Sequence, residues 1–223
     1  MSPGESMPRP RDNPCRPQPS PAGHGWHIAL AEGPVGLRPL RRRDAQAWQE
    51  VRQRNWDWLR PWEATQPPDI AHLGQLSIPQ LLRSFRREAT QGRMLPFVIT
   101  YRDTFVGQLT VSGITWGSSC SGQLGYWLDE KVAGRGIMPT AVALVVDHCF
   151  STVHLHRVEV NICPDNMASR RVVEKLGFRE EGLRRRYLHI NGIWRDHVAY
   201  SLTVEEVAEG LLKRWRCRQG TLP

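Results

Sequence analysis

The glycine-rich loop Lys131–Ile137 has the residue types that bind phosphate. Its members are Lys131, Val132, Ala133, Gly134, Arg135, Gly136 and Ile137. Glycines let a backbone turn tightly and point successive N–H groups at one place. The apolar helix expected over 140–150 would add its free N-terminal N–H groups and the positive end of its dipole. We therefore predict a phosphate site at this loop.

Two other interpretations of the loop stay open on these residues alone. A plain glycine-rich turn is the first. The second is a dinucleotide fingerprint, because Gly134 and Gly136 supply its first two glycines and Glu159 lies where a ribose-binding carboxylate would stand. Pro139 occupies the third glycine position, however, and the preceding strands do not open a repeating βαβ array. This mismatch counts against a dinucleotide site.

A second group follows about thirty residues later, where Asn166 and Ser169 open the helix expected over 167–176. Residues three apart on a helix reach the same side, so the amide and the hydroxyl could meet one ligand. The alternative is that either side chain simply caps the helix.

Trp58, Trp62 and Glu63 form a third group, in a segment that also holds Trp56. Aromatic walls with a carboxylate suit a cationic amine, so this segment is the expected substrate-binding side. The alternative is that the tryptophans belong to the hydrophobic core.

Hydrophobic periodicity predicts the elements that would position these groups. Helices are expected over 44–54, 79–91, 140–150, 167–176 and 205–216, and strands over 35–40, 95–101, 105–114, 123–128 and 157–162. Strands over 184–190 and 194–202 flank Asn191-Gly192, which favours the type I′ turn of a hairpin. The order predicts an α/β domain with a mostly antiparallel sheet, and one βαβ-like crossover from 123–128 to 157–162.

Composition sets the boundaries and excludes some classes of protein. Residues 1–25 hold seven prolines and almost nothing apolar. We expect a disordered Pro-rich N-terminal tail over 1–33, a folded domain over 34–204 and a C-terminal helix or tail over 205–223. No run of about 18 apolar residues offers a membrane span, and because the N-terminus has no apolar h-region we expect no secretory signal.

The net charge of +8 suits polyanionic partners, but the basic residues do not gather on one element, so no direct sequence-specific nucleic-acid binding is expected. Five cysteines without a C-x-x-C pair indicate a reducing cytoplasm. His148, Cys149, His154, His156 and Cys163 cluster in sequence, but their spacing matches no zinc pattern, so no metal is expected.

Two motifs in this order resemble the GNAT superfamily of acetyl-CoA-dependent N-acetyltransferases. The family's phosphate loop reads Gln/Arg-x-x-Gly-x-Gly/Ala, and Lys131 at the first place keeps the positive charge. Asn161–Ser169 followed by Glu174–Phe178 is similar to the second motif. The resemblance covers about Val35 to Val204. Three further segments are similar to the RimJ/RimL group, which acetylates N-termini of ribosomal proteins: Leu59–Glu63, Leu124–Trp127, and Gly182–Arg184 with Asn191-Gly192-x-x-x-Asp196-His197.

The resemblance implies a single GNAT-type domain with flanking helices and a splayed strand pair at the acetyl-CoA site. It implies an acyltransferase that moves acetyl from acetyl-CoA directly to an amine, with no acyl-enzyme. Backbone groups near Leu128 would align the pantetheine arm, and the N–H groups of Val132–Ile137 would hold the pyrophosphate. Asn166 would hold the pantetheine end, and Ser169 would donate to the leaving thiolate.

The proton acceptor has no clear counterpart in the sequence. Asn161 and Leu188 stand where enzymes of the superfamily carry a catalytic carboxylate. Glu159 shares a strand face with Asn161 and is a candidate for a base that acts through water. A salt bridge from Glu159 to Arg157 or Arg179 is the alternative.

The expected acceptor is the N-terminal α-amine of a protein, with a ribosomal protein or the ribosome as partner. A small amine is the alternative acceptor. A third interpretation is a CoA-binding or ribosome-associated module that has lost catalysis. A monomer and a homodimer both stay open.

Overall fold

The computed structural model describes residues 27–69 and 76–220, so residues 1–26 of the disordered tail expected over 1–33 lie outside the described residues. Leu30–Glu32 form the strand β1, and the sheet therefore begins before residue 34, the start expected from the sequence. Three residues are too few to show β alternation. They become a strand because they pair with the next strand across a turn at Gly33.

The strands form one eight-stranded sheet in the order β1-β2-β3-β4-β5-β6-β8-β7. Neighbouring strands are antiparallel except β5 and β6, which run parallel. The connection from β5 to β6 passes through a helix, which confirms the predicted crossover and the mostly antiparallel α/β sheet. The strands are β1 (Leu30–Glu32), β2 (Val35–Pro39), β3 (Leu95–Tyr101), β4 (Thr104–Thr115), β5 (Ser121–Leu128), β6 (Arg157–Ile162), β7 (Arg179–Ile190) and β8 (Ile193–Thr203).

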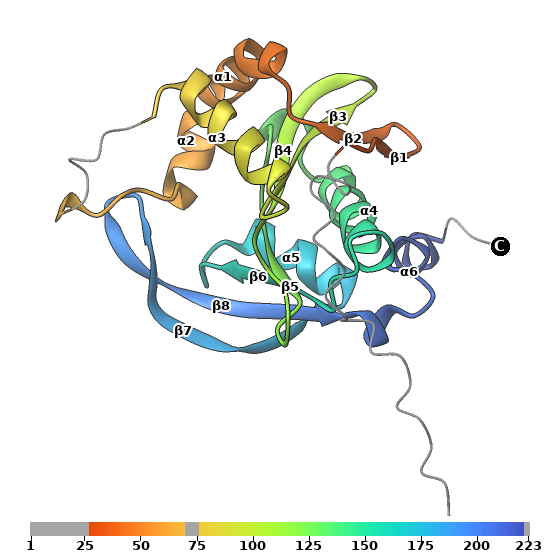
Figure 1. Ribbon diagram of the computed structural model, residues 1–223. Helices are drawn as coiled ribbons and strands as arrows, with labels where there is room; N and C mark the ends of the chain where they lie inside the picture. The colour runs from red at the N-terminus through yellow and green to blue at the C-terminus, as the bar shows by residue number, and fades with distance from the viewer. Residues whose placement is uncertain (1–26, 70–75, 221–223) are drawn as a thin grey trace, which may run out of the picture.

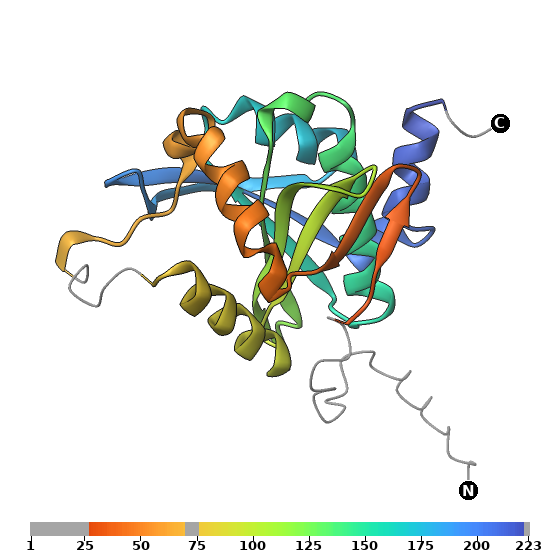
Figure 2. The same ribbon diagram turned by 90° about the horizontal axis from the view of Figure 1, so that it is seen from above.

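The helices lie on both sides of this sheet (Figures 1 and 2). They are α1 (Ala45–Arg54), α2 (Trp56–Leu59), α3 (Ile78–Thr90), α4 (Ile137–Ser151), α5 (Met167–Leu176) and α6 (Leu211–Arg218). The main core lies between the sheet and α4, α5 and α6. A smaller core on the opposite face joins α1 and α3 to Val98 and Phe105 of the central strands.

α4 is almost wholly buried because the sheet covers one side and α6 another. Its apolar run matches the helix predicted over 140–150. The structure starts it three residues earlier, at Ile137, directly after Gly136. Pro139 then falls within the first turn, where a missing N–H removes no helical hydrogen bond.

β7 and β8 form the predicted hairpin. Asn191 (φ 46°) and Gly192 (φ 86°) both adopt the left-handed conformation that the two-residue type I′ turn requires. The hairpin is longer than predicted, because β7 starts at Arg179. Its register shifts twice along β7, and these irregularities interrupt the alternation that would have revealed the first residues from sequence.

The segment after β8 differs from the single helix expected over 205–216. It forms a short 3-10 turn at Val204–Val207 and then α6, separated by Gly210 at φ 92°. Asp147 of α4 accepts from the N–H of Leu211 at 2.6 Å and of Leu212 at 3.0 Å, and so caps α6. The local sequence cannot reveal this cap, because Asp147 comes from another helix.

Trp215 joins α6 to α4. Its ring is 6% exposed, and its indole N–H donates to Thr140 Oγ1 at 2.9 Å. Removing the ring would leave a cavity beside α4. We expect Trp215→Ala to lower the free energy of unfolding by about 3–5 kcal/mol, measured by urea denaturation.

Trp215→Phe is the matched control, because it keeps most of the ring and loses mainly the hydrogen bond, at a cost of about 1 kcal/mol. An equal loss of unfolding free energy in both variants would show that the packing of the ring does not stabilise the protein.

Candidate active site

β5 and β6 separate soon after they meet. Their parallel pairing covers only Ser121–Gln123 with Arg157–Glu159. Beyond this point β5 stays paired with β4 as far as Leu128, while β6 stays paired with β8. The two strands therefore diverge inside the sheet, which is the splayed pair that the resemblance implies.

Gly107 of β4 allows this divergence. A Cβ at Gly107 would lie 2.4 Å from the carbonyl oxygen of Trp127 and 3.1 Å from Cα of Leu128. The end of β5 thus approaches β4 more closely than any other residue type at position 107 would allow. At this point β5 is paired with β4 and no longer with β6.

A cavity of about 540 Å³ lies beside the end of β5. It brings together residues of all three groups that the sequence singles out. Those in its wall are Trp58, Trp62, Glu63, Leu128, Ala133, Gly134, Gly136, Ile137, Asn166 and Ser169. Lys131, Val132, Arg135 and Glu159 are not among the lining residues. One continuous space therefore joins the predicted donor and acceptor ends.

Two glycines shape the loop before α4. Gly134 (φ 79°) and Gly136 (φ 77°) are both left-handed, a conformation that other residues rarely adopt. Nothing lies within 4 Å of a Cβ built on Gly134, whereas one on Gly136 would lie 3.1 Å from Nε2 of Gln219. The first-turn N–H groups of Ile137 and Met138 have no helical acceptor by geometry, so they are donors for a bound anion.

Asp129 ties the start of this loop to α1. Burial would raise the pKa of Asp129, but hydrogen bonds from Arg54 and Asn55 outweigh it and hold that pKa below its usual value. Asn55 Nδ2 donates to Asp129 Oδ1 at 3.0 Å, and Asn55 Oδ1 accepts from the N–H of Glu130, also at 3.0 Å. One amide therefore holds both the carboxylate and the backbone of the loop.

Asn166 and Ser169 meet at the start of α5. Asn166 Oδ1 accepts from the N–H of Ser169 at 3.1 Å, so Asn166 does cap the helix. The cap uses only the oxygen of the amide, and the NH₂ group keeps its own two donors. Ser169 Oγ donates to the hydroxyl of Tyr126 at 2.9 Å, a contact between residues 43 positions apart.

Trp58 and Trp62 are half-buried in the cavity wall and belong to neither core cluster. Glu63 forms an ion pair with Arg52. The guanidinium of Arg52 also lies over the rings of Trp48, at 4.8 Å, and Trp127, at 5.4 Å. The end of the cavity near Trp58 and Trp62 is therefore aromatic, with one carboxylate held by one cation.

The segment that carries Glu63 docks on the tip of the β7–β8 hairpin, as Figure 1 shows. Ala64 forms an antiparallel bridge with Ile190, and the N–H of Thr65 donates to the carbonyl of His189 at 2.9 Å. We call residues 63–65 the strap. The strap joins the aromatic segment to the far end of the sheet and fixes its position.

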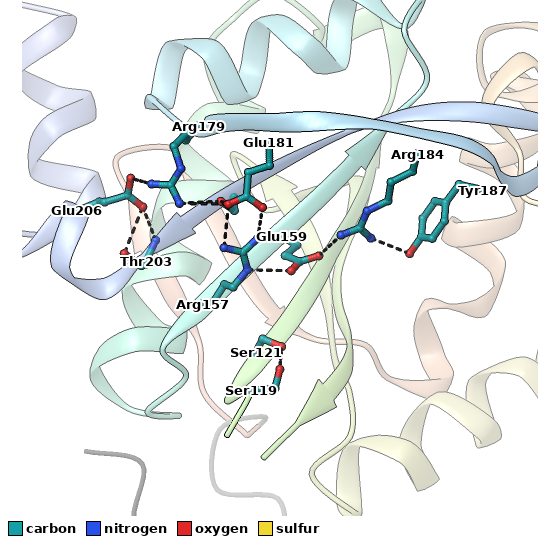
Figure 3. Close-up of polar contacts among 11 residues, drawn as sticks. Ser119, Ser121, Arg157, Glu159, Arg179, Glu181, Arg184, Tyr187, Thr203 and Glu206 are labelled. Carbon is teal, nitrogen blue, oxygen red and sulfur yellow. Dashed lines mark hydrogen bonds and ion pairs between the residues drawn. The ribbon is translucent and has the colours of Figure 1, made fainter. Parts of the chain in front are cut away.

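Glu159 lies in a network of ion pairs on the face of β6 opposite α4 and α5 (Figure 3). Arg157 Nε donates to one of its carboxylate oxygens at 2.8 Å, and Arg184 Nη2 donates to the other at 3.0 Å. The salt bridge to Arg157 was one of the sequence-based alternatives. Arg179 instead pairs with Glu181 and Glu206.

Several lining residues have only weak signals in the sequence. Ala168, Arg171, Val172 and Lys175 lie on one side of α5 at helical spacing, so periodicity could have found them once the helix was placed. Tyr126 lies in Leu124–Trp127, a segment similar to the RimJ/RimL group, but its contact with Ser169 has no local signal in the sequence. The contact of Arg52 with Glu63 has none either, because in both pairs the partner comes from another element.

Comparison with known proteins assigns the family. The model of the acetyltransferase (GNAT) domain matches residues 35–179. The ribosomal protein uS5 alanine N-acetyltransferase of Escherichia coli is 30% identical over 185 residues, which cover 82% of this chain and 94% of that protein. The chain therefore belongs to the GNAT family of N-acetyltransferases.

Within this family the chain is similar to RimJ. A structure of Mycobacterium smegmatis RimJ in complex with CoA-disulfide superposes with a TM-score of 0.79 at 40% identity, covering 88% of this chain and 97% of that chain. The Bacillus subtilis protein named Probable N-acetyltransferase YjcK is 43% identical over 95 residues, 43% of this chain. The matched part spans about half of that relative, 52%.

Among the residues that the structure describes, no group of three or more His, Cys, Asp and Glu side chains is placed to hold a metal ion. None of the described helices combines the length and apolar character that a membrane span needs.

The ion-pair network predicts a pH-dependent stability. The hydrogen bond from Arg157 lowers the pKa of Glu181 from 4.5 to about 2, and Ser201 and Arg179 donate as well. Because the folded-state pKa is lowered, the stabilisation is complete above about pH 4.5 and is lost as the pH falls toward 2.

We expect Glu181→Gln to lower the free energy of unfolding by about 1 kcal/mol at pH 7, a value reduced for solvent screening of this partly exposed group. The difference from the unchanged protein should shrink toward zero as the pH approaches 2, measured by urea denaturation. Glu209→Gln, in an exposed pair with Lys213, is the control and should change stability less. A difference that does not depend on pH would contradict this role of Glu181.

Proposed function

We propose that this enzyme transfers the acetyl group of acetyl-CoA to the N-terminal α-amine of a ribosomal protein. The observation that carries the proposal is the single cavity, whose wall holds the glycine loop at one end and the Trp58–Glu63 segment at the other. The similarity to the uS5 alanine N-acetyltransferase and to RimJ supports the same donor and acceptor.

The donor end suits the pyrophosphate of CoA. The left-handed Gly134 and Gly136 and the start of α4 offer backbone N–H donors and the positive end of a helix dipole. Arg171 and Lys175 of α5 line the same cavity and add two cations. Lys131, Val132 and Arg135 are not in the cavity wall, so a contribution from the backbone of these residues rests on the resemblance to the family loop alone.

The middle of the cavity suits the pantetheine arm and the thioester. Leu128 ends β5 beyond its divergence from β6, so its backbone can align an extended amide chain. The NH₂ group of Asn166 is the donor proposed for the pantetheine end. Ser169 is proposed to donate to the sulfur as the thiolate leaves, because its hydroxyl is in the wall.

The acceptor end suits a single protonated chain end. Trp58 and Trp62 supply aromatic faces, and Glu63 supplies a carboxylate that an ammonium group could share with Arg52. The pKa of an α-amino group at the end of a peptide is about 8, so a useful share of it is already neutral near pH 7. We propose that water takes the remaining proton.

A panel of acceptors tests the proposal. We expect the enzyme with acetyl-CoA to acetylate peptides that carry a ribosomal-protein N-terminus, and to leave the same peptides unmodified when their α-amine is blocked. Mass spectrometry of the products gives the site. Acetylation of polyamines or aminoglycosides alone would replace the proposed acceptor with a small amine. CoA binding without turnover on any amine would support a non-catalytic module.

Glu159→Gln tests whether this carboxylate is the base. Both its oxygens accept from guanidinium groups, so taking a proton would require breaking an ion pair. We expect kcat/KM for the peptide to stay within about twofold, since the barrier to transfer is unchanged. A loss of about a hundredfold or more, with a changed pH profile, would identify Glu159 as a general base.

A further inference from the structure

Tyr126 links β5 to α5 at the cavity wall. Ser169 Oγ donates to the Tyr126 hydroxyl at 2.9 Å, and that hydroxyl donates to the carbonyl oxygen of Ser169 at 3.4 Å. Both residues line the cavity. In this arrangement the proton of Ser169 points at Tyr126 and away from any ligand.

The hydrogen bond between the two hydroxyl groups can run in either direction, because each is both donor and acceptor. If the Tyr126 O–H turns toward Ser169 Oγ, the Ser169 proton is free to point into the cavity. Tyr126 gives up only the bond to the carbonyl, which at 3.4 Å is long for an O–H donor. The reversal therefore needs two bond rotations and no movement of either backbone.

Tyr126 is suited to hold its proton through this reversal. Burial raises the pKa of its phenol well above the usual value of 10.0, against a smaller opposing effect of the Ser169 hydrogen bond. The buried phenolate is thus disfavoured, and Tyr126 acts as a donor that stays neutral. A chain of hydroxyl groups that ends on an anion is strengthened by each successive donor.

We propose that Tyr126 is a positioning residue for the departure of CoA, whose hydroxyl donates to Ser169 Oγ and turns the Ser169 proton toward the leaving sulfur. The inference rests on the acetyl transfer proposed above. As the C–N bond forms and the C–S bond breaks, the electron pair of the C–S bond stays on sulfur as a thiolate. The proton of the amine passes to water, and the thiolate later takes a proton from water, so neither hydroxyl loses one.

The test measures the thiolate directly and needs no acceptor. CoA with a free thiol is bound to the full-length protein, and the pH is varied while the ultraviolet absorbance of the thiolate is recorded. The protein with the desulfo analogue of CoA, which has no thiol, is the blank. Bound to the unchanged protein, the thiol should have a lower pKa than free CoA. Tyr126→Phe and Ser169→Ala should each raise this bound pKa by about one unit, a tenfold change in the acid equilibrium.

Tyr126→Phe removes the phenol hydroxyl but keeps the ring and its packing. Ser169→Ala removes the other hydroxyl of the same hydrogen bond. Tyr101→Phe, at the end of β3, is the control because Tyr101 is not among the residues that line the cavity, and it should leave the bound pKa unchanged. In the double variant the bound pKa should rise no further than in the single variant with the larger rise, because both residues act through one hydrogen bond to sulfur. In the peptide assay, Tyr126→Phe should lower kcat about tenfold and leave the KM for acetyl-CoA within about twofold.

A bound thiol that titrates like free CoA would overturn the proposal, and so would a Tyr126→Phe protein with the pKa of the unchanged protein. A lowered pKa that depends on Tyr126, without acetylation of any peptide, would remove the proposed acceptor and support the role of Tyr126. Acetylation of a peptide, with a bound pKa that does not depend on Tyr126, would support the proposed acceptor and remove the role of Tyr126.

Discussion

The architecture depends on the short pairing between β5 and β6. A sheet normally satisfies the backbone groups of each interior strand on both sides, and an unpaired stretch costs free energy unless another group pairs with it. Here β5 loses its partner after Gln123 and keeps only β4. The divergence leaves backbone donors and acceptors beside a cavity, which is where an extended amide chain such as the pantetheine arm could replace the missing strand.

The elements around this divergence are coupled to one another. Asn55, at the end of α1, holds Asp129 and Glu130, so the aromatic segment and the glycine-rich loop share one anchor. The strap at residues 63–65 holds the same segment from the other end, through the hairpin tip. The two halves of the cavity are therefore positioned by common contacts rather than by separate ones.

The sequence predicts the features whose causes are local. Gly134 and Gly136 permit left-handed turns, Asn191-Gly192 favours a tight hairpin turn, and Asn166 precedes a helix whose first turn needs an acceptor. Contacts between residues that are far apart in the sequence cannot be predicted in this way. The Ser169–Tyr126 contact, the Arg52–Glu63 ion pair and the cap of α6 by Asp147 all depend on tertiary packing. Glu159 illustrates the same limit, since its face of β6 is predictable from alternation but the arrival of Arg184 from β7 is not.

Gly107 does not line the cavity, yet it packs directly against Trp127 and Leu128, which do. Its missing side chain lets the end of β5 approach β4, and any larger residue would clash with the backbone of Trp127 and Leu128. A mutational scan scored on acetylation would therefore report residue 107 as intolerant, alongside positions in the cavity wall. The cause of this intolerance would be the close spacing of β4 and β5. Sensitivity to substitution at residue 107 would therefore not mean that the residue contacts a ligand.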